Sequence, residues 1–264
     1  MKQYQKYPIV DHTSFIEKAI IYLGKFPVYC PVCGNISFIS KINKINLRES
    51  CQSYCCNSTN RQRQMAIAIC KYLRTSSLKK ISKYQGSIYN TESFGPIHNE
   101  LIKAGHYTCS EYFGNKYKSG KVYNGTLHQD LMNLSFSDQT FDIVLSSDVF
   151  EHISKPYLAH KEIYRVLKPG GIHIFTVPFS SSGYHDEKRA SIVKGKIKHH
   201  LAPIVHLDGI RPDSGTLVYN IFSLEMVVRL DKIGFSTKIL NIKSLINGVI
   251  GEGNLVFISS KNTF

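Results

Sequence analysis

Cysteine residues that could bind a metal ion are concentrated near the start of the chain. Five of the seven cysteines lie between Cys30 and Cys56, and they begin with the sequence CPVCG. Two thiolates separated by such a tight turn can bind one ion, and the glycine lets backbone amides face the sulfurs. The second pair of ligands must consist of Cys51 with either Cys55 or Cys56. The pattern predicts a zinc-ribbon-like module; the alternative is that these thiols pack as small apolar side chains.

A histidine that could act as a general base follows an apolar segment in the second half of the chain. The segment runs from Phe141 to Ser146, and Glu151 and His152 come shortly after it. The unperturbed pKa of histidine, about 6.5, suits removal of a proton from a hydroxyl or an amine at neutral pH. His152 is therefore the expected base. The alternative is that the Glu151-His152 pair only shapes the loop.

The elements around this pair predict an α/β fold. FDIVLS is typical of a buried strand, YLAHKEIYRVL has apolar residues at helical spacing, and IHIFTVP is typical of the next buried strand. The sequence KPGG ends the helix with a basic residue, a proline and glycines. This order is half of a doubly wound α/β unit, in which residues at the strand ends face a ligand.

The same segment resembles the class I methyltransferases that use S-adenosylmethionine. Their signature is an FD-apolar strand, a following EH, then RVLKPGG and a strand that ends in proline. The matching residues here are Phe141-Asp142, Glu151-His152, Arg165 to Gly171, and Pro178. The resemblance implies a Rossmann-like methyltransferase fold, with a mostly parallel sheet, an antiparallel edge strand and helices on both faces. It also implies S-adenosylmethionine as the cofactor.

The turn expected after the first strand lacks the usual G-x-G-x-G glycines. It reads IYNTESFGP, and only Gly95 aligns with the last glycine of that motif. The turn is similar to the YE-x-S-x-G-P segment of methyltransferases from bacterial surface-polysaccharide gene clusters. This resemblance implies that Ser93 and Gly95 line the methionine part of the cofactor, and that Glu92 meets its amino group. The alternative is a turn that only caps the next helix.

Further strand ends provide the other expected cofactor contacts. Glu111 lies at the end of the second strand, YTCSEYF, where a carboxylate can accept hydrogen bonds from both ribose hydroxyls. The resemblance implies that Asp130 faces the adenine amino group and that Leu131 covers the ring. It places Ser147 in the loop over the transferred methyl group. Asp142, within the matching sequence LSFSDQTFD, is expected to support the fold without touching substrate.

A long polar insertion follows the strand that ends the signature. It covers about residues 179–220, more than a simple connection needs, and is expected to form a lid over the acceptor. His206, Asp208 and the segment from Gly215 to Tyr219 resemble the same polysaccharide-cluster enzymes. We expect His185 and His206 to contact the acceptor; the alternative is that they are loop residues without a role.

The cysteine region also resembles those enzymes, which carry CPVCG, a later cysteine and an N-R-x-R sequence before the catalytic domain. In that pattern the last cysteine lies five residues before the first arginine, here Arg61, which selects Cys56. The third ligand would fall at Ser53, so a neighbouring cysteine must replace it. The expected zinc ligands are Cys30, Cys33, Cys51 and Cys56, with Cys55 as the alternative.

Length, hydropathy and charge limit the remaining possibilities. The 264 residues suffice for a Cys-rich module at 1–60, led by a short helix, and a methyltransferase domain at 61–264. No apolar run is long enough for a membrane span, and the N-terminus lacks the apolar core of a signal peptide, so we expect a cytoplasmic protein. The net charge is +14, but the basic residues are scattered. They do not indicate a nucleic-acid surface.

Together these features predict transfer of a methyl group to a small-molecule acceptor, a sugar or a glycan-linked hydroxyl or amine. Two alternatives stay open. An RNA or protein methyltransferase could use the Cys-rich module and the positive charge for docking, although no aromatic and basic interleaving is present. A catalytically inactive binding protein could have kept the fold while losing the glycine turn.

Overall fold

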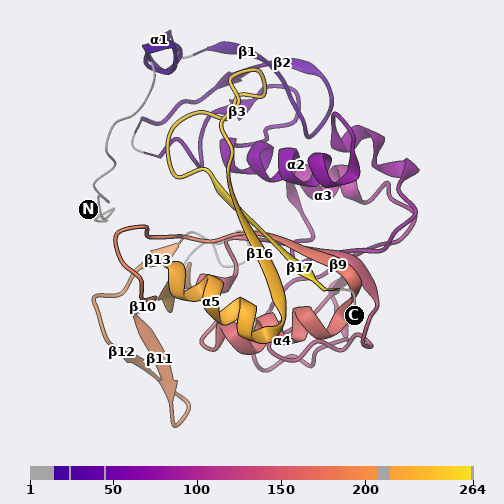
Figure 1. The fold of residues 1–264 in the computed structure, drawn as a ribbon, viewed down its shortest axis with the longest axis vertical. Helices are drawn as coiled ribbons and strands as arrows, with labels where there is room; N and C mark the ends of the chain where they lie inside the picture. Colours follow the sequence, from indigo (N-terminus) through magenta and orange to yellow (C-terminus); the bar gives the residue numbers. More distant parts are fainter. Residues whose placement is uncertain (1–14, 24, 45, 207–214, 263–264) are drawn as a thin grey trace. The chain divides into compact units, whose positions relative to one another are not determined.

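The computed structural model describes residues 15–262 except 24, 45 and 207–214, so Asp208 lies outside the described residues (Figure 1). The chain forms two compact units: Met1–Lys80 with Asn241–Asn254, and Ile81–Leu240 with Leu255–Phe264. The sequence placed the boundary at residue 60 and did not assign residues 241–254 to the first unit. The structure differs because the helix that begins at residue 60 is hydrogen-bonded to that later segment.

The first unit contains a three-stranded antiparallel sheet, with β2 between β1 and β3. Val28 and Ile39 from this sheet pack with Cys51 and Ile250 in a small apolar core. The expected leading helix is present as α1. The elements are α1 (Phe15–Leu23), β1 (Phe26–Tyr29), β2 (Ile36–Ser40), β3 (Gln52–Ser53) and α2 (Asn60–Leu73), followed by the 3-10 helix η1 (Leu78–Lys83).

Helix α2 is fixed at both ends. Thr59 and Gln62 form a capping box, in which the Gln62 amide donates to the Thr59 hydroxyl and the Thr59 amide donates to Gln62 Oε1. Arg74 ends the helix in the left-handed conformation. In the first turn, the Asn60 side chain donates to the carbonyl of Ile250 at 2.8 Å and accepts from its amide at 3.0 Å.

The buried guanidinium of Arg63 makes a second connection between α2 and residues 241–254. The side chain has no exposed surface. It donates hydrogen bonds to the carbonyl oxygens of Asn247 at 3.0 Å and Gly248 at 2.7 Å, and also to that of Ser58. A buried charge is tolerated only when its donors are satisfied in this way. Arg63 therefore determines how the later segment closes the first unit.

The second unit contains a six-stranded sheet in the order β16-β17-β9-β8-β4-β5. Strands β5, β4, β8 and β9 are parallel, and β17 runs antiparallel to β9. This arrangement agrees with the predicted Rossmann-like fold and its mixed sheet. The strands are β4 (Ile88–Asn90), β5 (Tyr107–Cys109), β8 (Phe141–Ser147), β9 (Leu167–Thr176), β16 (Phe235–Asn241) and β17 (Leu255–Lys261).

The strand expected near Asp130 is reduced to isolated bridges, one of which joins Asp130 to Asn133. Glu111 pairs with His128 in parallel, outside any named strand. The chain instead forms a small hairpin before it, with β6 (Val122–Tyr123) paired to β7 (Thr126–Leu127). The sheet therefore ends at β5 on this side.

Two helices cover the apolar core of the second unit. Helix α4 contributes Ala159 and Ile163, and α5 contributes Met226 and Leu230, to a cluster that also contains Phe175 of β9. Gly234 ends α5 in the left-handed conformation, as its position after an amphipathic segment predicts. The helices are α3 (Gly95–Leu101), α4 (Pro156–Val166) and α5 (Leu224–Ile233), with a 3-10 helix η2 (Phe150–His152) before α4.

Asp142 joins the starts of three neighbouring strands. Its Oδ2 accepts hydrogen bonds from the amide and the hydroxyl of Ser87, before β4, and from the amino group of Lys168 in β9, all at 2.7 Å. Lys168, the hydroxyl and the amide together lower the pKa of the Asp142 carboxyl against the effect of burial. The expectation that Asp142 is structural agrees with this placement.

Arg165 organises the loop that carries the sequence LSFSDQTFD. Its guanidinium donates to the carbonyls of Leu134 and Phe136 and to the carboxylates of Asp138 and Glu162, at 2.7–3.0 Å. Arg165 therefore fixes the conformation of this loop, which lies between the bridge at Glu111 and the start of β8.

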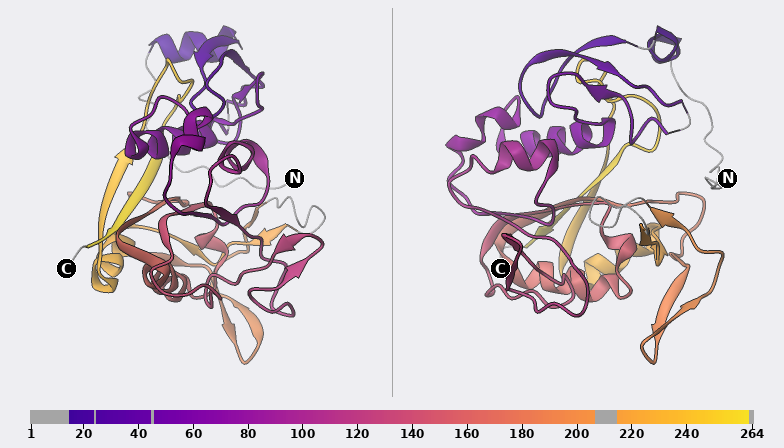
Figure 2. Two further views of the ribbon diagram at one scale, coloured as in Figure 1. Left: turned by 90° about the vertical axis from the view of Figure 1, so that its right-hand side faces the viewer. Right: turned by 180° about the vertical axis from the view of Figure 1, so that it is seen from behind.

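The described residues of the insertion after β9 form short antiparallel strand pairs. The β11–β12 hairpin extends away from its neighbours in the second unit (Figure 2). None of the described helices is long and apolar enough to span a bilayer. The strands are β10 (Glu187–Lys188), β11 (Ala190–Val193), β12 (Lys196–His199), β13 (Val205–His206), β14 (Thr216–Leu217) and β15 (Asn220–Ile221); the pairs are β10 with β15, β11 with β12, and β13 with β14.

Two fully buried histidines lie in the core near η2. His160 of α4 stacks on Phe150, with ring centroids 3.9 Å apart, and His173 Nε2 is 2.9 Å from the Ser146 hydroxyl. Burial lowers the pKa of His173 to about 3. Burial, together with the neighbouring His173, also holds the pKa of His160 well below its ordinary value. Both rings are therefore neutral in the folded protein near neutral pH.

Replacing Arg63 should destabilise the first unit. In the R63M variant the carbonyl oxygens of Ser58, Asn247 and Gly248 each lose the hydrogen bond from the buried guanidinium, so we expect the free energy of unfolding to fall by about 3–5 kcal/mol. Urea unfolding followed by far-ultraviolet circular dichroism measures this loss. The matched variant is R61M, because Arg61 pairs with the exposed Glu49 and an exposed pair contributes about 1 kcal/mol or less. Equal losses in the two variants would contradict the assigned role of Arg63.

The buried histidines should make the second unit less stable in mild acid. Their folded-state pKa values lie below the unfolded value, so the unfolded chain binds more protons as the pH falls below about 6.5. Each histidine should then remove about 1.4 kcal/mol of stability per pH unit. In the H160F variant the aromatic contact with Phe150 remains, but one titratable side chain is lost. We expect its unfolding free energy to decline less steeply between pH 6.5 and 5 than that of the parent; an identical slope would contradict the assignment.

Candidate functional site

Ser93 and Glu111 meet at the carboxyl ends of two neighbouring parallel strands. Ser93 follows β4 and Glu111 follows β5. Glu111 Oε1 accepts hydrogen bonds from the Ser93 amide at 2.7 Å and from the Ser93 hydroxyl at 3.0 Å. Two of the residues expected at the cofactor are therefore in direct contact. This is the edge of a parallel α/β sheet at which ligands bind.

A side-chain hydrogen bond supports the turn between β4 and α3, which lacks the usual glycines. The Asn90 side chain donates to the carbonyl of Glu92 at 2.9 Å, which holds the turn against the end of β4. Gly95 has a φ of 91°, a conformation that strains other residues, and it begins α3. The expected residues Glu92, Ser93 and Gly95 thus lie on one turn next to Glu111.

Asp130 and Leu131 occupy different environments. Asp130 is half-buried, and its Oδ1 accepts a hydrogen bond from the Met132 amide at 2.9 Å. The Ser119 hydroxyl accepts from the Asp130 amide. Leu131, in contrast, is 7% exposed and packs in the apolar core of the second unit. The structure therefore leaves Asp130 partly accessible and turns most of the Leu131 side chain away from solvent.

Polar groups join the carboxyl ends of β8 and β9. The hydroxyls of Ser147 and Thr176 are 3.2 Å apart, and Thr176 donates to the Asp148 carboxylate at 2.9 Å. Asp148 has a φ of 53°, so the chain turns sharply as it leaves β8. Ser147 is thus the buried last residue of β8, whereas the sequence placed it in the following loop. Asp148 and Thr176 were not identified from the sequence, because only the paired strands bring them together.

Glu151, His152 and His206 form a compact group beyond the end of β8. The Nε2 atom of His152 lies 3.3 Å from Nδ1 of His206 and 3.8 Å from Oε1 of Glu151. His206 Nδ1 is 3.7 Å from the same Glu151 oxygen. Glu151 has no exposed surface, whereas His152 and His206 are partly exposed. Two residues that the sequence placed at the acceptor therefore converge on a buried carboxylate.

The two candidate acceptor histidines have separate positions. His206 lies on β13, whose partner β14 provides the Leu217 carbonyl that accepts a hydrogen bond from His152 Nδ1 at 2.8 Å. His185 is exposed, and its Nδ1 is 3.3 Å from the Glu225 carboxylate on α5. It takes no part in the group around His152.

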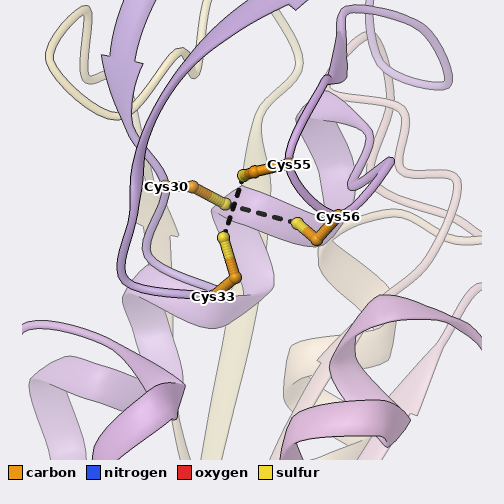
Figure 3. A group of neighbouring side chains, drawn as sticks. All are labelled: Cys30, Cys33, Cys55 and Cys56. Atoms are coloured by element: carbon orange, nitrogen blue, oxygen red, sulfur yellow. Dashed lines mark hydrogen bonds between the residues drawn. The ribbon is translucent and has the colours of Figure 1, made fainter.

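Four cysteines of the first unit converge (Figure 3): Cys30, Cys33, Cys55 and Cys56, whose sulfur atoms all lie within 4.8 Å of one another. The sulfurs of Cys33 and Cys55 are 2.9 Å apart, and those of Cys30 and Cys56 are 3.6 Å apart. Four sulfurs at 2.3 Å from a tetrahedral zinc ion would be about 3.8 Å apart. The group therefore fits one zinc ion after small side-chain movements.

Cys55, the alternative ligand, takes the place expected of Cys51. Cys51 is fully buried in the apolar core of the first unit, and its backbone has a φ of 57°. Cys55 lies beside Ser53, the position at which the third ligand was expected, with 2.9 Å between the Ser53 hydroxyl and the Cys55 sulfur. The expected set is therefore corrected in one member, because the left-handed turn at Cys51 could not be read from spacing.

Protons are unevenly shared among the four thiols. A hydrogen bond from Cys56 lowers the pKa of the Cys30 thiol to about 4, whereas burial raises the pKa of Cys33 to about 12. The group thus carries few negative charges by itself, since like charges so close together repel. A divalent cation would allow the other thiols to ionise.

Part of the second unit is similar in sequence to known proteins. Residues 105–175 match the family described as a methyltransferase domain. A protein from Mycobacterium tuberculosis described as an uncharacterized methyltransferase is 42% identical over 57 residues, which are 21% of this chain and 22% of that protein. A protein from Mycobacterium avium with the same description is 40% identical over 57 residues, again 21% and 22%. The chain thus matches these curated relatives over about a fifth of their length.

Solved structures provide more extensive but more distant similarities. The 1,6-didemethyltoxoflavin-N1-methyltransferase of Burkholderia thailandensis, solved with 1,6-didemethyltoxoflavin and S-adenosylhomocysteine, has a TM-score of 0.47 and 13% identity, covering 77% of this chain and 78% of that one. A S-adenosylmethionine-dependent methyltransferase from Methanosarcina mazei has a TM-score of 0.40 and 19% identity, covering 68% and 94%. The match to the methyltransferase domain family extends over residues 105–175 of this chain.

Proposed function

We propose that the protein is a S-adenosylmethionine-dependent methyltransferase whose acceptor is a small molecule, a sugar or a glycan-linked hydroxyl or amine. The observation that carries the proposal is the contact between Ser93 and Glu111 at the carboxyl ends of β4 and β5. The neighbouring strand β8 leads at the same edge to Glu151 and His152. Cofactor and acceptor positions are thus adjacent, as group transfer requires.

The residues at this edge have complementary parts in cofactor binding. Glu111 accepts hydrogen bonds from the ribose hydroxyls, since a carboxylate can serve both. The backbone of Ser93 and Gly95 lines the methionine portion, and Glu92 lies beside its amino group. Asp130 accepts from the adenine amino group. Leu131 is proposed to cover the adenine ring, and Ser147 to lie near the transferred methyl group.

The chain's own contribution to the reaction is to position the acceptor and take its proton. S-adenosylmethionine supplies an activated sulfonium methyl group, so alignment of the acceptor provides much of the rate. The Nδ1–H group of His152 donates to Leu217, which leaves Nε2 with a lone pair. In this proposal Nε2 accepts the proton of the acceptor hydroxyl or amine, and the insertion with His206 encloses the acceptor.

The four-cysteine group of the first unit is proposed to hold one structural zinc ion. Cys30, Cys33, Cys55 and Cys56 supply a tetrahedral thiolate set of the kind that structural zinc sites use. Such a closed site has no open position for a substrate. Its effect is therefore on the stability of the first unit, and it takes no part in methyl transfer.

Calorimetric titration with S-adenosylmethionine and S-adenosylhomocysteine tests the proposed cofactor. We expect micromolar binding of both, and a loss of about 1–3 kcal/mol in the E111A variant, because the ribose hydroxyls lose a charged acceptor. In the S93A variant the backbone amide still donates to Glu111, so the loss should be smaller. Absence of binding at millimolar cofactor, or an unchanged affinity in E111A, would overturn the assignment.

Metal analysis distinguishes the two possible sets of cysteine ligands. Zinc should be present in the four-cysteine group of the purified protein, and the C55S variant should lose it, since one of four thiolates is removed. The matched C51S variant removes a buried cysteine outside the group and should retain that zinc. Loss of zinc in C51S with retention in C55S would refute the ligand set.

A further inference from the structure

The group of Glu151, His152 and His206 has the chemical composition of a catalytic metal centre. Each residue offers one atom that can donate a lone pair, and the three distances between these atoms are 3.3, 3.7 and 3.8 Å. A point at the centre of a triangle with these sides lies about 2.1 Å from every corner. That is the bond length of first-row divalent ions to imidazole nitrogen and carboxylate oxygen.

The hydrogen bonds around the group prepare His152 to bind an ion. Its Nδ1–H donates to the Leu217 carbonyl at 2.8 Å. The lone pair is therefore on Nε2, the atom that faces Glu151 and His206. A metal-binding histidine almost always donates its other N–H to a carbonyl or carboxylate in this manner, which fixes both the tautomer and the orientation of the ring.

The three side chains come from two segments of the chain. Glu151 and His152 belong to η2, and the Tyr219 amide, next to β15, donates to the Glu151 carbonyl at 2.7 Å. His206 lies on β13, and Gly215 directly precedes the partner strand β14. Gly215 has a φ of 64°, and a Cβ atom there would lie 2.4 Å from the His206 carbonyl oxygen. The close approach that positions His206 therefore requires glycine.

Charge also favours a cation at this place. The Glu151 side chain has no exposed surface, and removing an ionised carboxylate from water is costly unless positive charge compensates it. Two imidazoles and one carboxylate are the ligands of catalytic zinc sites that keep one position open. The same ligands serve other divalent transition ions, with imidazole disfavouring magnesium and calcium.

We propose that Glu151, His152 and His206 bind one divalent transition-metal ion, with zinc as the probe, and leave a coordination position for an oxygen of the acceptor. The role at the acceptor rests on the proposed function and changes one of its steps. With the ion bound, Nε2 of His152 is a ligand and no longer the base. The acceptor hydroxyl binds the ion, its pKa falls, and its proton passes to solvent water before the oxygen takes the methyl group.

Zinc stoichiometry and affinity test this centre in the full-length protein. After saturation with zinc and dialysis, elemental analysis should find about two ions per chain, and one in either H206A or C55S. Calorimetric titration of H206A and of E151Q should show at least a 100-fold weaker affinity at the second site, since even outer partners of metal ligands contribute 10- to about 100-fold. The Gln substitution keeps the size of the buried side chain.

The matched variant is H199A, which removes an exposed histidine of the same insertion outside the group. It should bind zinc as the parent does. One ion per chain, lost in C55S and unchanged in H206A, would overturn the proposal and leave the 3.3 Å contact as a hydrogen bond between the two histidines. Equal loss in H199A and H206A would also overturn it.

Titration with S-adenosylmethionine in the same preparations separates this inference from the proposed function. Zinc at the second site without cofactor binding would retain the metal centre and reject the methyltransferase. Cofactor binding without the second zinc would retain the methyltransferase and reject the metal centre.

Discussion

One carboxylate determines the register on which the candidate site depends. Asp142 receives three hydrogen bonds from Ser87 and Lys168, and it thereby ties the beginnings of β4, β8 and β9 to one another. When the starts of parallel strands are held in register, the relative positions of their carboxyl ends are also fixed. The turn with Ser93 and the loop with Glu151 follow the far ends of β4 and β8, so a signature residue outside the candidate site helps to position residues within it.

Long periodic segments were predictable because their structure is determined locally. The strand at β8, the helix α4 and the strand β9 follow from apolar spacing and from the KPGG stop, and the structure contains all three. The strand expected near Asp130 had weaker periodicity, and there the chain makes only isolated bridges among the described residues. The hydrophobic pattern thus predicts the central strands of the sheet, whereas the structure of its edge depends on tertiary contacts.

The candidate sites depended more on pairings between distant residues, which spacing does not encode. His185 and His206 looked equivalent in the sequence, but pairing of β13 with β14 brings only His206 to His152. Cys51 and Cys55 were similarly ambiguous until the backbone turn at Cys51 directed its thiol into the core. Arg63 was part of a recognised N-R-x-R sequence, yet its bonds to Asn247 and Gly248 join residues too distant for any pattern to reveal.

The discontinuity of the first unit constrains the order in which the protein can fold. A ribosome produces the cysteines and α2 early, but Asn247 and Gly248, which accept from Arg63, are made only after the whole of Ile81–Leu240. Domains made first usually fold first. Here the N-terminal unit must wait, with its buried arginine lacking two of its acceptors, until translation has passed residue 248. Most of the second unit, Ile81–Leu240, is therefore synthesised ahead of the segment that completes the first unit, and β17 follows that segment.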